Sequence, residues 1–455
     1  MFFQDLFNID PNSIVQCTGQ TTCTVIHAFV FSALFLFVVI TGFAYTTLLE
    51  RKLIARLQHR VGPNRVGPRG LLQPAADGVK LAFKEDIVPS GAYKTVWMIA
   101  PILKMVPTLI VMAVIPLGPN ILIPWFDGLW YNVPLGLADP NVGVLWLLAI
   151  TSIGTYGVVL AGWASNNKYA MLGGIRASAQ MISYELSLGI TMTVPILIVG
   201  SMSIKDIIEA QASPPVIGWF IFQNPLAAAI LMIALLAEVN RAPFDLPEAE
   251  QELTAGYMTE YSGMKFAMFM MAEYLGMIAV SLIAVSLFFG GYHFVLVDGA
   301  PITGPAIMIG KVVLLLAGMI WIRATLPRIR YDRLMAFGWK VMLPLSLLSV
   351  AWTAIAITIG ETGNATAYGV VSVILFATVI VGGFVYLTRS GQIEMLDEEE
   401  ELDPLITGEK RGVGYIILQI VGGLIGFAFL LWDVQLRMLR GLAQLGEPPE
   451  DAPQS

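Results

Sequence analysis

Ten long apolar runs constrain the fold of this chain more than any other feature of its sequence. A transmembrane helix needs about 20 consecutive, mostly apolar residues to cross the hydrocarbon core of a bilayer. Of the 455 residues, 56% are hydrophobic and 13% are charged, whereas a soluble domain is typically about 25% charged. One aqueous core cannot bury that much apolar surface, so we expect an all-α polytopic membrane protein. The predicted spans lie at 25–48, 96–118, 142–164, 182–201, 217–238, 264–289, 306–325, 340–360, 367–388 and 413–433.

The distribution of basic residues predicts the orientation of these helices. The connections at 49–95 and 322–340 are rich in Lys and Arg, whereas those at 119–141 and 290–305 contain neither. Basic connections are retained in the cytoplasm. We therefore expect the N-terminus to lie outside the membrane. The long basic connection and the 165–181 loop should lie inside, as should the acidic stretch described below.

The cysteines and histidines exclude most cofactor chemistry from this chain. Cys17 and Cys23 are too few for an iron–sulfur cluster, and the three histidines have no metal-ligand spacing. The two cysteines could pair in an oxidising compartment, or both could remain free thiols. No long basic tract is present, so nucleic acid is not an expected partner.

An acidic stretch at 236–263 interrupts the apolar pattern. Acid clusters usually form a solvated face, but Glu238 ends the apolar run LMIALLA without a polar lead-in. Pro243 and Pro247 then break the backbone, so the chain turns there. Acids at a membrane edge or in a protein-lined cavity are functional candidates. The stretch carries a single cation, Arg241, and these carboxylates: Glu238, Asp245, Glu248, Glu250, Glu252 and Glu260.

Two more acids stand inside predicted spans. Glu185 lies about one turn into the fourth span, and Glu273 lies in the middle of the sixth. A charge at the centre of a membrane helix costs about 2.5–3.5 kcal/mol on insertion scales, so each acid should face a wet interior or a partner. A structural pair, such as Glu185 with a nearby Arg or Lys, is one interpretation. Interacting carboxylates that exchange protons through water are the other, and two buried acids beside an acidic stretch favour it.

The basic connection contains a predicted amphipathic helix. Leu72, Ala76, Val79 and Phe83 recur on one face, while polar residues including Asp77 and Lys80 recur one position later. Such a helix is suited to the membrane interface. The preceding RVGPNRVGPRG could bind phosphate or form a rigid loop against a partner or lipid. The second interpretation is favoured because no strand precedes it.

Four long motifs carry a resemblance to a known family. They are LLERKLIARLQHRVGPNRVGPRGLLQPAADGVKLAFKE, LAGWASNNKYAMLGGIRASAQMISYEL, LAEVNRAPFDLPEAEQELTAGYMTEYSGMKFAMFMMAEY and WIRATLPRIRYDRLMAFGWKVMLPL. Over about residues 45–350 the chain resembles the heel subunits of respiratory complex I, which in bacteria is the proton-translocating NADH-quinone oxidoreductase.

The resemblance implies a fold and a function. It implies an eight-span core in the bacterial plasma membrane, forming the quinone access chamber and the first acidic segment of a proton relay. The chain would bind no cofactor itself: NADH, FMN and iron–sulfur clusters would belong to partner subunits, and quinone would be the substrate. Expected partners are the quinone-site and iron–sulfur subunits of the hydrophilic arm, the small membrane subunits beside the antiporter-like ones, and membrane lipid.

The resemblance also assigns candidate residues, which fall into two groups. The proton-relay candidates are Glu185, Glu238, Asp245, Glu248, Glu252, Glu260 and Glu273. The quinone-chamber candidates are Arg51, Arg60, Asp77, Lys80, Arg241, Arg323 and Arg328. Glu185 and Glu238 are favoured for proton transfer because apolar sequence surrounds each of them. Arg241 is the expected counter-charge of the acidic stretch. Glu248 and Glu252 would share one face of a helix and interact.

The predicted organisation has four parts. They are an N-terminal non-cytoplasmic segment at 1–24, the core at 25–360, a two-span extension at 361–434 and a disordered tail at 435–455. The extension and tail lie outside the resemblance.

Three alternative functions make different demands on the sequence. A heel subunit of a membrane hydrogenase or deazaflavin-linked complex would keep the fold and change the electron donor. A stand-alone proton-coupled transporter would be expected to show an internal repeat, and none is evident. A purely structural anchor would have no reason to carry acids inside its spans.

Overall fold

The computed structural model describes residues 14–17, 21–124, 129–214, 216–245, 255–294 and 303–360, with residues 373, 374, 377, 378 and 381. The chain divides into two units, residues 1–373 and 374–455, and the helices described below belong to the first. The predicted domain boundaries stay predictions, because the C-terminal extension and tail fall almost entirely outside the described residues.

Helices dominate the described residues, which confirms the predicted fold class. Within the described part of the chain, seven helical segments are long and apolar enough to cross a membrane, and they correspond to seven of the eight predicted core spans. The first six are α2 (Thr21–Leu57), α4 (Lys94–Ala113), α5 (Gly143–Ala164), α6 (Lys168–Val199), α11 (Gly263–Phe288) and α12 (Thr303–Thr325). The seventh joins α13 (Tyr331–Phe337), the π-helical turn η5 (Gly338–Met342) and α14 (Leu343–Gly360).

The remaining predicted core span, 217–238, is broken. A short α8 (Phe220–Gln223) precedes α9 (Pro225–Glu238), and the Asn224 side chain between them accepts a hydrogen bond from the backbone N–H of Ala227 at 3.0 Å. At about 1.5 Å per residue, the 14 residues of α9 cover about 21 Å, less than the roughly 30 Å of a bilayer core. Glu238 therefore ends a helix that is too short to span the membrane by itself.

The prediction of a loop at 165–181 is wrong, because most of this segment is helical. α6 begins at Lys168, where the side chain of Asn167 accepts a hydrogen bond from the backbone N–H of Tyr169 at 3.0 Å and caps the helix. The segment carries small residues instead of large apolar ones, and these let its backbone approach another part of the chain closely. A Cβ at Gly173, for example, would lie 2.6 Å from the backbone of Gly256. Glu185 consequently lies near the middle of α6, not one turn from its start.

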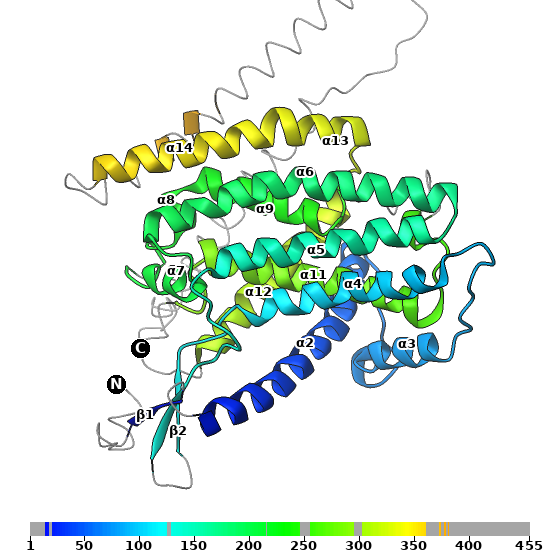
Figure 1. Ribbon diagram of the computed structural model, residues 1–455, viewed down its shortest axis with the longest axis horizontal. Helices are drawn as coiled ribbons and strands as arrows, with labels where there is room; N and C mark the ends of the chain where they lie inside the picture. Colours follow the sequence, from blue (N-terminus) through cyan, green and yellow to red (C-terminus); the bar gives the residue numbers. More distant parts are fainter. Residues whose placement is uncertain are drawn as a thin grey trace, which may run out of the picture. The chain divides into compact units, whose positions relative to one another are not determined.

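Five helices lie side by side around the site described below (Figure 1). α4 packs on α5, α5 on α6, and α6 on α9, while α11 contacts α4 and α9. A buried core between α4, α5, α6 and α11 includes Trp97, Met181 and Phe269, all fully or almost fully buried. At Gly157 of α5, a Cβ would lie 2.7 Å from the backbone nitrogen of Lys104, so a larger residue there would push α5 away from α4.

The predicted amphipathic helix is confirmed as α3 (Gln73–Ala82), which follows a short 3-10 turn, η3 (Pro68–Gly70). No residue of α3 is buried, and Phe83 at its C-terminal end is 88% exposed. An apolar face that nothing in the described chain covers is suited to lipid or a partner.

A three-stranded sheet, which the sequence analysis did not predict, joins two distant segments. β1 (Ile14–Gln16) pairs in parallel with β3 (Trp130–Val133), and β2 (Ile121–Pro124) pairs antiparallel with the same strand. Cys17, directly after β1, forms a disulfide bond with Cys23 in the first turn of α2. The sequence left open whether these cysteines pair or remain free thiols, and the structure shows that they pair.

The register of the sheet bears on the predicted orientation. Tyr131 of β3 lies opposite both Val15 of β1 and Ile123 of β2. The segment before the first span and the connection between α4 and α5 must therefore lie on the same side of the membrane. Both are expected outside, because the second contains no Lys or Arg.

Vesicle labelling tests this orientation. In right-side-out vesicles, an impermeant phosphine should reduce the Cys17–Cys23 bond and allow an impermeant maleimide to label both thiols. The chain contains no other cysteine, so a variant with serine at both positions gives the background. Labelling that occurs in inside-out vesicles instead would contradict the predicted orientation.

Candidate functional site

One internal cavity brings charged side chains from several helices together. It has a volume of about 60 Å³ and lies between α4, α5, α9 and α11. A buried water needs about 10–15 Å³ on this measure, so there is room for several waters between the charged groups. Its polar lining includes Lys104, Thr108, Thr151, Glu238 and Glu273, and we call this space the Lys104 cavity.

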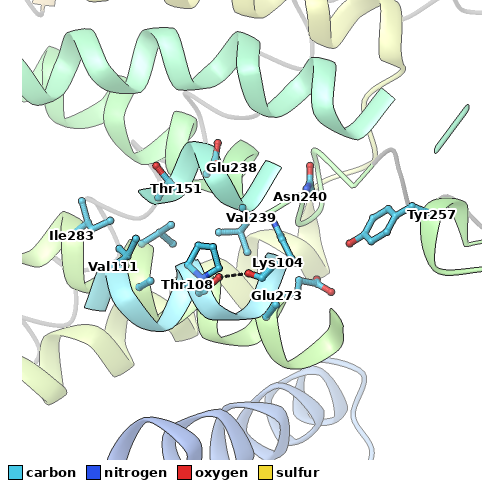
Figure 2. A pocket seen from close by; sticks show the side chains of 16 residues that line it. Lys104, Thr108, Val111, Thr151, Glu238, Val239, Asn240, Tyr257, Glu273 and Ile283 are labelled. Atoms are coloured by element: carbon cyan, nitrogen blue, oxygen red, sulfur yellow. Dashed lines mark hydrogen bonds between the residues drawn. The ribbon is translucent and has the colours of Figure 1, made fainter. Parts of the chain in front are cut away.

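Figure 2 shows how these side chains lie. Lys104 and Thr108 belong to α4, with Glu273 beside Lys104, while Glu238 lies beside Thr151. The Thr108 and Thr151 hydroxyls donate to backbone carbonyls of their own helices, at 3.0 Å and 3.1 Å. Their oxygen lone pairs remain available to accept hydrogen bonds from water.

Glu238 has the least compensated carboxylate of the cavity. Its Oε2 atom is fully buried and has no hydrogen-bond partner among the residues that the structure describes. Lys104 and Glu185 are both close enough to act on it electrostatically. A buried acid with an unsatisfied oxygen is costly, and such groups are retained where they carry function.

Arg241 is the centre of a buried ion network next to the cavity. Its Nε lies 2.5 Å from Oε1 of Glu273, and its Nη1 lies 3.4 Å from Oε1 of Glu50. Glu50 also pairs with Arg323 at the C-terminal end of α12. The Arg241 guanidinium lies over the ring of Tyr274, 4.4 Å from the ring centroid. This network joins α2, α11 and α12 to the segment that follows α9.

Burial alone would lower the pKa of Arg241, but the nearby carboxylates of Glu273 and Glu50 outweigh it and raise that pKa above its ordinary value. Arg241 is therefore a fixed positive charge. The expectation that Arg241 is the counter-charge of the acidic stretch stays a prediction. Among the described residues its direct ion pairs are with Glu50 of α2 and Glu273 of α11, and it also acts electrostatically on Asp245 of the stretch.

Asp245 forms a second pair at the end of the described part of the acidic stretch. Its Oδ2 accepts from Nη2 of Arg328 at 3.0 Å. Burial raises the pKa of Asp245, and the positive charge of Arg328 partly opposes that shift. Two of the arginines predicted for the quinone chamber, Arg323 and Arg328, thus pair with buried acids.

Two other relay candidates lie apart from the cavity. Glu185 accepts a hydrogen bond from the hydroxyl of Ser152 on α5. The alternative that it forms an ion pair with an Arg or Lys finds no such pair among the described residues. Glu260 accepts from the amide of Asn167 at 2.6 Å and lines a separate pocket. The structure therefore separates Glu260 from Glu238, although both lie in the same stretch of sequence.

The remaining chamber candidates lie around α3. Arg51 of α2 pairs with Asp77 of α3, with Nη1 2.5 Å from Oδ2, and Gln73 donates to the same carboxylate at 3.2 Å. Arg60 and Lys80 are exposed. Three acids of the stretch, Glu248, Glu250 and Glu252, lie outside the described residues.

The sequence analysis missed two residues of this site. Lys104 is a charge inside the predicted span 96–118, so the rule that singled out Glu185 and Glu273 would have found it. Glu50 falls within the predicted connection 49–95 and was not singled out, but α2 continues to Leu57 and Glu50 is buried, at 5% exposure. Among the described residues, no group of three His, Cys, Asp or Glu side chains could hold a metal ion.

Comparison with known proteins places the chain among close relatives. A family model described as NADH dehydrogenase matches residues 30–354. The chain is 49% identical over 336 residues to one of the H subunits of NADH-quinone oxidoreductase from Geobacter sulfurreducens, covering 71% of this chain and 93% of that protein. It is 48% identical to the H subunit of the same enzyme from Thermomicrobium roseum, covering 69% and 90%. It is 49% identical to the H subunit from Deinococcus radiodurans, covering 68% and 78%.

The ion network makes a prediction about stability. Arg241→Met removes one buried positive charge that two buried carboxylates, Glu273 and Glu50, share, and breaking a buried pair in this way typically costs about 3–5 kcal/mol. We expect a clearly lower apparent Tm of the purified complex, measured by fluorescence-detected size exclusion after heating.

The matched control is Arg330→Met. Arg330 pairs with Asp332 at 3.2 Å, but both side chains are more than 70% exposed, so its loss should cost at most about 1 kcal/mol. Equal apparent Tm values for the two variants would show that the Arg241 network does not stabilise the fold.

Proposed function

This chain belongs to the NADH dehydrogenase family, as an H subunit of NADH-quinone oxidoreductase, and we propose that it forms the quinone access chamber and the first acidic proton relay of that enzyme. It is a multi-pass membrane subunit, and its partners include other subunits of the complex. The finer roles that follow are argued from the contacts of its own side chains.

The Lys104 cavity carries the proton-relay part of the proposal. It places Glu238 and Glu273 around a space large enough for water, and Glu185 lies near enough to influence Glu238. Proton transfer between carboxylates needs a continuous path of groups that donate and accept hydrogen bonds. The cavity supplies such groups inside otherwise apolar helices, where a structural role alone would not justify the cost of the charges.

The region around α3 supports the chamber. A quinone joins a long apolar tail to a small polar headgroup, so its path must offer an apolar opening beside a few polar groups. The exposed side chains of α3 offer the apolar opening. The polar groups are the Arg51–Asp77 pair, with Lys80 and Arg60 nearby in sequence. We propose quinone as the substrate here, with NADH, FMN and iron–sulfur clusters bound by partner subunits.

The buried ion network offers a connection between the two regions. Glu50 lies one residue before Arg51 and contacts both Arg241 and Arg323. Arg241 in turn contacts Glu273 at the Lys104 cavity. A change of charge near the quinone could therefore alter the field at the cavity through two ion pairs. We further propose that the chain lies in the bacterial plasma membrane with its N-terminus outside.

The relatives' names bear on the alternatives. All those compared are named NADH-quinone oxidoreductase subunits, which favours this enzyme over a hydrogenase or deazaflavin-linked complex. Membership of that family also argues against a stand-alone transporter.

Substitution of Glu238 tests the relay. Glu238→Gln removes the titratable group with little change of volume, so proton translocation coupled to quinone reduction should fall by at least about tenfold. Both rates would be measured on one sample of the assembled complex in proteoliposomes. Glu209→Gln is the control, because Glu209 is exposed and forms only a loose ion pair, 4.0 Å from Lys205. Wild-type translocation by Glu238→Gln would exclude the relay role.

Substitution of Asp77 tests the chamber. Asp77→Asn breaks the contact between α2 and α3 at a partly exposed position, so the fold should persist while the opening changes. We expect the apparent KM for a long-tailed quinone, varied within the proteoliposome membrane, to rise several-fold with little change of kcat. Asp86→Asn breaks a similar pair with Lys265 at 2.5 Å and serves as control. If the two variants have the same KM, Asp77 has no role in quinone access.

A further inference from the structure

Lys104 is a cation inside a membrane helix whose charge is not neutralised by direct contact. None of the ion pairs among the described residues includes it. The one hydrogen-bond acceptor that its Nζ reaches in the described chain is the sulfur of Met181, at 3.6 Å. A thioether is a weak acceptor, so it cannot compensate the burial of an ammonium group.

A second lysine inside a span, in contrast, has all of its hydrogen-bond donors paired. Lys311 of α12 donates to the backbone carbonyls of Phe289, Gly291 and His293, at 2.7, 2.8 and 2.8 Å. It also lies 4.2 Å from the ring centroid of Trp219. All three of its donors are used, and Lys311 holds the chain after α11 in place. Lys104 has no comparable set of acceptors in the described chain, so its position is not explained by a structural role of that kind.

The surroundings of Lys104 differ on its two sides. Glu273 already has a counter-charge, because Arg241 lies 2.5 Å from it. Glu238 has a buried Oε2 with no partner in the described chain. Lys104 acts electrostatically on both glutamates, but Glu238 is the one whose charge Lys104 must balance. The Lys104 cavity separates the two groups by a space that water can fill.

We propose that Lys104 is a proton-exchanging member of the relay, which passes a proton to and from Glu238 through water in the cavity. This inference rests on the relay role proposed above and adds a residue to it. In the forward step the Lys104 ammonium gives one proton to a water, and that water gives one proton to the Glu238 carboxylate. The products are a neutral amine and a neutral carboxylic acid, and the reverse step restores the ion pair.

The exchange is physically favourable because it leaves the net charge of the cavity unchanged. In a medium of low dielectric, moving an isolated charge is costly, whereas an ion pair and its neutral form can be close in free energy. Glu273 stays paired with Arg241 during this one step, so the electrostatic background of the exchange does not change. Glu238 can then pass its proton toward Glu185, and a proton that enters the cavity from outside and is conducted through its water protonates the Lys104 amine again.

Two substitutions of Lys104 separate proton exchange from a fixed charge. Arginine keeps the positive charge but does not release a proton in proteins, whereas methionine removes the charge at similar length. If Lys104 exchanges protons, Lys104→Arg and Lys104→Met should both lower proton translocation by at least about tenfold in the assembled complex. Wild-type translocation by Lys104→Arg would show that only a fixed charge is needed and would overturn the proposal, as would wild-type translocation by Lys104→Met.

The controls distinguish this proposal from the relay itself. Lys205→Met removes a partly exposed cation outside the cavity, whose Nζ lies 4.0 Å from Glu209, and translocation should be unchanged. If Glu238→Gln abolishes translocation while Lys104→Met preserves it, the relay stands and the role of Lys104 is refuted. If Glu238→Gln retains translocation, the relay itself is refuted, and the role of Lys104 is refuted with it.

Chemical modification gives the same comparison if arginine prevents assembly. Lys104→Cys introduces the single free thiol of this chain, since Cys17 and Cys23 are bonded to each other. An aminoethyl thiosulfonate would attach a titratable amine, and a trimethylammonium-ethyl thiosulfonate would attach a fixed cation. We expect the first reagent alone to restore translocation, with the treated parent complex as control. Equal restoration by both reagents would overturn the proposal.

Discussion

The ion pairs of Arg241 are the interaction on which the rest of this site depends. A guanidinium that is 5% exposed must find counter-charges, because a buried cation without them costs several kcal/mol. Arg241 meets this requirement with Glu273 on α11 and Glu50 on α2, and Glu50 extends the network to Arg323 on α12. These contacts hold the backbone just after α9, so that Glu238, three residues earlier, stays at the Lys104 cavity instead of reaching solvent.

The low dielectric of the membrane makes it costly to bury a charge without a counter-charge or hydrogen-bond acceptors. Apolar helices supply few acceptors, so each buried charge must be paired, capped by backbone carbonyls or placed beside water. The described chain uses all three solutions: Arg241 is paired, Lys311 is capped, and Lys104 faces a cavity. Only the third leaves a charge free to change, which is why proton exchange is assigned there and not to the other two.

Local sequence signals predicted the helices well and their ends less well. Apolar runs identified seven spans and periodicity identified α3, because both depend on neighbouring residues. The start of α6 was missed because Gly173 and Gly174 resemble a loop until the close approach of η4 (Gly256–Met258) explains them. The break before α9 depends on the Asn224 cap. The predicted shared face of Glu248 and Glu252 lies outside the described residues and stays a prediction.

By itself the sequence determined that this is a helical membrane protein, which family it belongs to, and that Glu185, Glu238 and Glu273 lie in apolar sequence. Those properties follow from composition, from runs of residues and from long motifs, all of which can be read along the chain. Only the tertiary structure decided which charges meet. Arg241 and Glu50 are 191 residues apart, and Lys104 and Glu238 line one cavity from two helices that are not neighbours in sequence. Helical periodicity fixes the face on which a residue lies, whereas contact between helices decides what that face touches.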